Sequence, residues 1–145
     1  MSAAAAEIRI GAQLVSAPYI LDEAAAKTYH DGIELPPRRR PPRGIHDDQD
    51  AARKAGFVAP IAGGAQTIAV IAQFLAESFG MRFVRGGRIE VALTRPVLFG
   101  DTLTSHAKIV SVDPKANRAE LQIHVENQRG EQVLTGTAAV RLGDA

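Results

Sequence analysis

Residues 65–79 read AQTIAVIAQFLAESF, a helix-forming segment whose apolar side chains fall on most of the helical circumference. A helix that is apolar nearly all round is typical of a protein core. The segment is shorter than the roughly 20 apolar residues that cross a bilayer. The sequence therefore predicts one long helix buried in the core, and it begins directly after Gly63 and Gly64.

From Arg82 onward the hydrophobic period changes to two. Apolar residues alternate with polar ones in residues 89–94 and again in residues 119–126. This alternation is typical of antiparallel strands with one buried face. Turn-forming residues at 112–117 and 127–131 separate the strands, so we expect four strands in a meander. One antiparallel sheet wrapped around one long buried helix is an α+β architecture.

Shorter elements occupy the first half of the chain. Residues 13–20 are expected to form an opening strand, and residues 21–32 a helix that Asp22 caps. Residues 33–45 contain four prolines and four arginines, which predicts an irregular loop. A short helix is expected at residues 47–56, because its acidic start and basic end complement the helix dipole.

Length and composition limit the possible functions. The 145 residues are expected to form a single domain (residues 1–145), with residues 1–10 flexible. A formal net charge of +1 and the absence of Trp argue against a nucleic-acid partner. The chain has no cysteine, and no spacing of His, Asp and Glu resembles a metal site, so we expect none. Because residues 1–7 do not resemble a signal peptide and no apolar run is long enough for a membrane, we expect a cytoplasmic protein that acts on a small molecule.

Two segments resemble a known family. Residues 45–64, IHDDQDAARKAGFVAPIAGG, and residues 95–104, RPVLFGDTLT, are similar to the two recurring segments of the MaoC-like hydratases and dehydratases, and the likeness extends over residues 11–142. This resemblance implies a single hot-dog domain and a homodimer or higher homo-oligomer with active sites between subunits. It also implies reversible addition of water to an enoyl thioester. No cofactor is then expected, and coenzyme A enters only as part of a possible substrate.

The resemblance carries over to two catalytic positions. His46 matches the family histidine, and imidazole exchanges protons near neutral pH, so we expect it to be the acid/base. A capping or buried structural histidine is the alternative. Gly64 matches the glycine whose backbone N–H stabilises the thioester oxygen. Gly63 and Gly64 precede the long helix, and the free N–H groups at a helix start favour negative charge. The alternative is that the two glycines only permit a tight turn.

Other catalytic positions depart from the family. Pro41 and Arg43 stand where the family has an aspartate and an asparagine, Gly63 replaces a histidine, and Ala72 replaces a polar residue. Neither proline nor arginine can act as a general base at neutral pH.

Residues from elsewhere must supply what these positions lack. We expect Asp31 to supply the missing carboxylate and Tyr29 to line the same cavity, whereas Asp47 and Asp48 are expected to stabilise the start of a helix. Arg43 is expected to bind an anionic substrate, and the remaining arginines of residues 33–45 either bind coenzyme A phosphates or are solvated.

These observations support three hypotheses. The first is a hydro-lyase that hydrates or dehydrates an acyl thioester, with His46 and Gly64 in the roles above. The second is a re-purposed hot-dog protein without hydratase activity, acting as a biosynthetic thioesterase or cyclase or as an acyl-binding protein. The third is a non-catalytic subunit whose active half is a different hot-dog chain.

Overall fold

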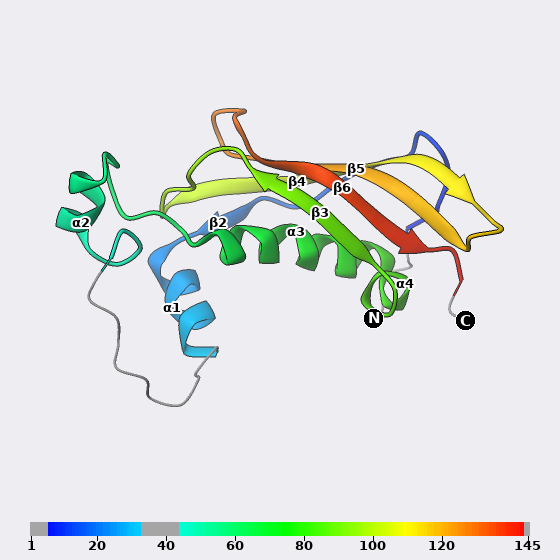
Figure 1. Cartoon of the computed structure of the whole chain (residues 1–145), viewed down its shortest axis with the longest axis horizontal. Coiled ribbons are helices and arrows are strands. Elements are labelled where there is room, and N and C mark those ends of the chain that lie inside the picture. Colours follow the sequence, from blue (N-terminus) through cyan, green and yellow to red (C-terminus); the bar gives the residue numbers. More distant parts are fainter. Residues whose placement is uncertain (1–5, 33–43, 144–145) are drawn as a thin grey trace.

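The computed structural model describes residues 6–32 and 44–143. It is a single α+β domain in which one antiparallel sheet curves around one long helix, as the sequence predicts (Figure 1). The helices are α1 (Glu23–Gly32), α2 (Gln49–Lys54), α3 (Gly64–Phe79) and α4 (Met81–Val84). The strands are β1 (Gln13–Val15), β2 (Tyr19–Leu21), β3 (Arg88–Leu93), β4 (Asp101–Asp113), β5 (Arg118–Glu126) and β6 (Gln132–Arg141).

The sheet departs from the expected four-stranded meander. Its order is β1-β4-β5-β6-β3, with β2 also pairing with β4, so β3 lies at the edge beside β6 instead of beside β4. Only β4, β5 and β6 form a meander. The connection between β3 and β4 spans residues 94–100, which is longer than a hairpin loop, and it carries the chain to the opposite side of the sheet.

The alternation in the strands sorts the side chains onto two faces. On β4 and β5 the odd-numbered residues from 101 to 109 and from 119 to 125 are buried, while most even-numbered residues are half-buried or exposed. The buried face packs against α3 through Ile71, Phe74, Leu75 and Phe79. This contact forms the hydrophobic core.

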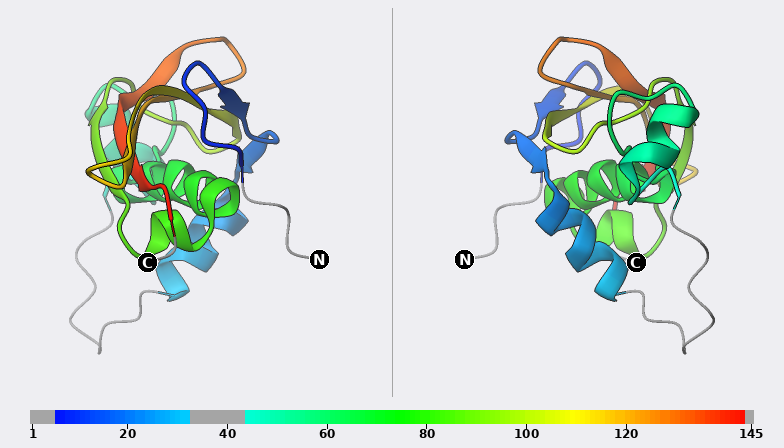
Figure 2. Two further views of the ribbon diagram at one scale, coloured as in Figure 1. Left: turned by 90° about the vertical axis from the view of Figure 1, so that its right-hand side faces the viewer. Right: turned by 90° about the vertical axis from the view of Figure 1, so that its left-hand side faces the viewer.

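One face of α3 is uncovered, which corrects the expectation that this helix is buried all round. Residues 65, 69, 73 and 77, spaced by one turn, are exposed. The reason is geometric, because a single sheet covers only one side of a helix (Figure 2). That face carries two alanines, a glutamine and a glutamate, so the large apolar side chains of α3 are all buried or half-buried.

The remaining elements follow the local signals closely. The opening strand is divided into β1 and β2, with Pro18 between them. The side chain of Asp22 accepts a hydrogen bond from the Ala25 N–H at 2.7 Å, which confirms the expected cap of α1. The helix α4 was not expected from the sequence. No helix in residues 6–32 and 44–143 is both long and apolar enough to cross a bilayer.

Candidate functional site

A cleft lies at the N-terminal end of α3, lined also by the end of β3 and the segment that follows it. Figure 1 shows how these elements are arranged. Its volume is about 300 Å³. The wall is mainly apolar, with a few polar groups, which is the composition of sites that bind small organic ligands. Its lining residues are His46, Ile61, Ala62, Gly64, Thr67, Leu93, Thr94, Arg95, Pro96 and Val97.

His46 lines this cleft with one of its ring nitrogens already engaged. Its Nδ1 lies 2.8 Å from the backbone carbonyl oxygen of Ile61. A carbonyl oxygen can only accept a hydrogen bond, so Nδ1 carries the proton. In the neutral ring Nε2 then keeps its lone pair and is free to take a proton from a ligand.

The backbone around Ile61 fixes the position of that carbonyl. The N–H of Ile61 donates to the carbonyl oxygen of Ile45 at 3.0 Å, and Ile61 also forms an isolated antiparallel bridge with Leu98. The next residue, Ala62, donates its N–H to the carbonyl oxygen of Val97 at 2.8 Å. The His46 ring is therefore oriented by a segment held from both sides.

Asp47 and Asp48 have structural roles. The Asp48 carboxylate accepts the Ala51 N–H at 2.8 Å and caps α2, while Asp47 accepts the Gly44 N–H at 2.7 Å. Neither residue lines the cleft. The geometry agrees with their interpretation as acids at a helix N-terminus.

Gly64 opens α3 and faces the cleft, whereas Gly63 is the N-cap residue. Within the described residues the Gly64 N–H donates to no acceptor, as is usual for the first residue of a helix. A Cβ at Gly64 would lie 2.6 Å from Cδ1 of Leu93, whereas one at Gly63 would meet no atom within 4 Å. Close packing against β3 is therefore one reason for a glycine at position 64, alongside any catalytic one.

The other expected site residues lie outside what the structure describes. Arg43 belongs to the 33–43 segment, as does Pro41. Tyr29 and Asp31 are residues of α1, but their side chains are outside the described part of the chain. The structure thus brings together His46 and Gly64 and leaves the roles of Tyr29, Asp31 and Arg43 as predictions.

Three polar residues of the cleft were not expected from the sequence. Thr67 lies one helical turn after Gly64 and is buried, and Thr94 and Arg95 follow β3 directly. Helical periodicity points to Thr67, because residues three apart share a face. The position of Arg95 at the start of the second recurring segment is the signal that could have found it.

The cleft wall at residues 94–98 is held by a buried carboxylate. Asp101 is only 3% exposed and accepts the Leu98 N–H at 3.0 Å. Its other oxygen accepts hydrogen bonds from Gln128 at 2.8 Å and Arg129 at 3.3 Å. This network ties the connection between β3 and β4 to the turn after β5.

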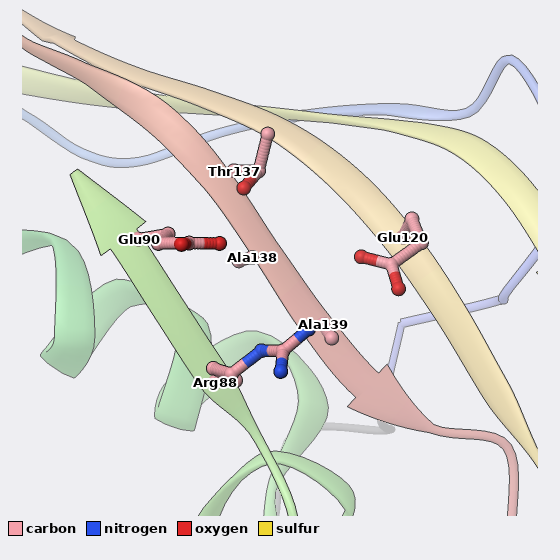
Figure 3. Close-up of a pocket in the computed structure, with 6 residues that line it drawn as sticks. All are labelled: Arg88, Glu90, Glu120, Thr137, Ala138 and Ala139. Carbon is pink, nitrogen blue, oxygen red and sulfur yellow. The ribbon is translucent and has the colours of Figure 1, made fainter.

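A second hollow, on the outer face of the sheet, is too small to bind a ligand. Figure 3 shows it over β6, with Arg88 and Glu90 from β3 and Glu120 from β5 around it. Its volume of about 40 Å³ is room for about one water molecule. The cleft beside His46 is therefore the better candidate site.

Comparisons with known proteins agree with this geometry. A family model described as the MaoC like domain matches residues 43–132. An unliganded (R)-hydratase from Pseudomonas aeruginosa superposes with a TM-score of 0.76 at 24% identity, covering 96% of this chain and 84% of that one. A MaoC-like dehydratase from Rhodospirillum rubrum gives a TM-score of 0.66 at 25% identity and 92% coverage of both chains.

A further similar structure is a complex of two different chains. The ChsH1-ChsH2 complex from Mycobacterium tuberculosis gives a TM-score of 0.69 at 16% identity, covering 94% of this chain and 100% of that one. No curated protein matches the sequence significantly.

Proposed function

Because the chain belongs to the MaoC-like family of hot-dog proteins, we propose that it is a hydro-lyase that adds water to an enoyl thioester or removes it from a 3-hydroxyacyl thioester. The observation that carries this proposal is the pairing of His46 and Gly64 at one cleft. Among residues 6–32 and 44–143, neither the Nε2 of His46 nor the N–H of Gly64 at the start of α3 has a hydrogen-bond partner. These are the two groups that the reaction requires, a proton acceptor and an oxyanion donor.

In hydration, His46 Nε2 takes a proton from water as the water oxygen bonds to the β-carbon. The electron pair of the double bond moves toward the thioester, and the negative charge that develops on its oxygen is stabilised by the Gly64 N–H. The same imidazolium then gives its proton to the α-carbon, which restores neutral His46. Dehydration is the reverse sequence.

The apolar wall of the cleft suits an acyl chain. Its apolar lining includes Ile61 from the segment before α3, Leu93 from β3 and Val97 from the connection after β3. Thr67 and Arg95 add polar groups. We propose Arg95 and Arg43 as contacts for the anionic portion of a substrate such as coenzyme A. Asp31 is our candidate for a second acid/base, and Tyr29 for a cavity residue.

The experiment is turnover of a short enoyl-CoA, followed by the loss of its ultraviolet absorbance and by identification of the 3-hydroxyacyl product. We expect activity in the wild type and its loss in His46→Gln. Asp31→Asn tests the second acid/base in the same assay. Unchanged turnover in the His46 variant contradicts the mechanism.

A re-purposed site is the second candidate, because no carboxylate lines the cleft in the described residues. A thioesterase would release free coenzyme A without forming a hydroxyacyl product. The chain has no cysteine, so a thiol reagent detects that release without a protein background. Thiol release in place of hydration favours the thioesterase, and saturable binding without turnover favours an acyl-binding protein.

We also propose that the working unit is a homodimer or higher homo-oligomer. Exposed apolar side chains support this, including Leu93 at the cleft (49% exposed), Val58 (76%) and Ile20 (60%). Native mass measurement tests it. A monomeric mass contradicts the proposal. If the chain forms a stable complex with a different hot-dog chain but not with itself, the partner-subunit hypothesis is supported instead.

A further inference from the structure

A second group of chemically active side chains lies on the outer face of the sheet, away from the cleft. Residues 106 and 124 are directly opposite each other in the antiparallel pairing of β4 and β5. Glu126 follows His124 by two residues on the same strand, so its side chain lies on the same face. The sequence places the two histidines 18 positions apart, and only the strand register makes them neighbours.

The geometry points to a metal site, and we propose that His106, His124 and Glu126 bind one divalent transition-metal ion, with zinc as the best match. One nitrogen from each histidine and one carboxylate oxygen all lie within 4.8 Å of one another. In a tetrahedral zinc site with bonds of about 2.0–2.1 Å, neighbouring ligand atoms are about 3.3 Å apart.

The distances already approach this arrangement. His106 Nε2 and the Glu126 carboxylate oxygen are hydrogen-bonded at 3.0 Å, and a metal ion that replaced the shared proton would need them at nearly this spacing. The two imidazole rings are stacked, with centroids 4.3 Å apart and planes 6° from parallel. Because imidazole lone pairs lie in the ring plane, the His124 ring must rotate out of the stack for its nitrogen to reach an ion shared with His106 and Glu126.

The chemistry of the ligands selects the class of metal. Two imidazoles and one carboxylate form a ligand set that suits zinc and similar divalent transition metals, whereas calcium and magnesium require mainly oxygen ligands. All three residues are half-buried, so an ion would keep coordination positions open to water.

The position of the cluster separates it from the proposed catalysis. His106 and His124 lie on the outer face of β4 and β5, whereas the His46 cleft lies beside α3 on the inner side of the sheet. A bound ion would link two central strands and stabilise the fold. The inference therefore does not rest on hydratase activity.

The test is zinc titration of tag-free protein by isothermal calorimetry, together with the melting temperature with and without zinc. We expect one ion per chain with a Kd of about 10 µM or tighter and a raised melting temperature. His106→Gln and His124→Gln should each weaken binding at least about tenfold. The sequence has two further histidines, His30 and His46. His46→Gln and His30→Gln are therefore the matched controls, and both should bind zinc as the wild type does.

Glu126→Gln provides an independent variant, because it keeps the size of the side chain and removes its charge. It should also weaken zinc binding, and it stays informative if a histidine variant does not fold. The proposal is overturned if zinc does not bind saturably, if binding survives in both histidine variants, or if the His46 or His30 control loses it equally. Equal binding of magnesium would overturn it too, since imidazole ligands would then play no part.

Discussion

Replacing Gly64 by alanine tests whether the start of α3 forms part of the active cleft. The added Cβ would lie 2.6 Å from Leu93 Cδ1, about 1 Å closer than ordinary van der Waals contact. Leu93 is 49% exposed, so its side chain can move away. Positions 64 and 93 both line the cleft. The new methyl group and the displaced Leu93 side chain would therefore narrow the cleft beside the backbone N–H of residue 64.

The expected effect on stability is small. An off-rotamer leucine costs about 0.5–1.5 kcal/mol, and alanine in place of glycine in a helix gains up to about 1 kcal/mol. The two terms nearly cancel, so the free energy of unfolding should change by less than about 1 kcal/mol. That corresponds to a shift of about 4 °C or less in the melting temperature.

The expected effect on activity is large by comparison. Alanine keeps the backbone N–H, so the effect arises because the methyl group holds the thioester oxygen away from it; loss of one oxyanion contact costs about 10²–10³ in kcat in enzymes that rely on it. We therefore expect Gly64→Ala to lower kcat/KM for an enoyl-CoA by at least about 10², with an unchanged fold by circular dichroism. Gly63→Ala is the matched control, because its Cβ meets no atom within 4 Å, and it should retain activity.

Leu93→Ala in the Gly64→Ala background completes the test. If crowding against Leu93 is the cause, shortening that side chain should restore part of the lost activity. Full activity in Gly64→Ala, or an equal loss in Gly63→Ala, would refute the reasoning. A loss of stability above about 3 kcal/mol would show that Leu93 cannot give way.

Three further predictions follow from single contacts. His46→Gln should lower kcat by about 10²–10⁴ with little change in urea unfolding, because the ring is exposed at the cleft; an equal loss of stability would indicate a structural role. Asp101→Ala should lower the free energy of unfolding by about 2–4 kcal/mol in a urea titration, since it leaves the Leu98 N–H without its acceptor, and a change below about 1 kcal/mol would contradict this. Hydrogen bonds from Asn127 and Arg129 lower the pKa of Glu131, so the stability that Glu131 contributes is present above pH 4.5 and is lost as the pH falls further. The stability gap between wild type and Glu131→Gln should therefore narrow from pH 6 to pH 3, and a gap that is independent of pH would contradict this.

The fold could be predicted because its signals are local. Residues 65–79 have a helical pattern, and residues 119–126 alternate strictly between apolar and polar, so both element types follow from sequence alone. The place of β3 could not be predicted in this way. It depends on where the connection at residues 94–100 carries the chain, and that is decided by contacts distant in sequence, such as the bridge between Ile61 and Leu98.

The candidate site could be predicted only in part, for a related physical reason. His46 and Gly64 lie in one recurring segment, so a resemblance finds both of them. Arg95 and Thr67 enter the same cleft from a connection and from α3, and their weaker signals, a place in the second recurring segment and helical spacing from Gly64, become useful only once the cleft is known. His106 and His124 are the least predictable of these residues, because only the register between β4 and β5 places them next to each other.

The backbone around Ile61 holds the His46 ring through contacts with residues that follow the 33–43 segment. Its N–H, its carbonyl oxygen and its bridge to Leu98 join the His46 turn to the connection between β3 and β4. These contacts all lie within residues 45–98, so the orientation of the imidazole does not require an aspartate or an asparagine at positions 41 and 43. We therefore expect His46 to keep its orientation in this chain. The mechanism that we propose accordingly assigns two steps to His46, the proton taken from water and the proton returned to the α-carbon.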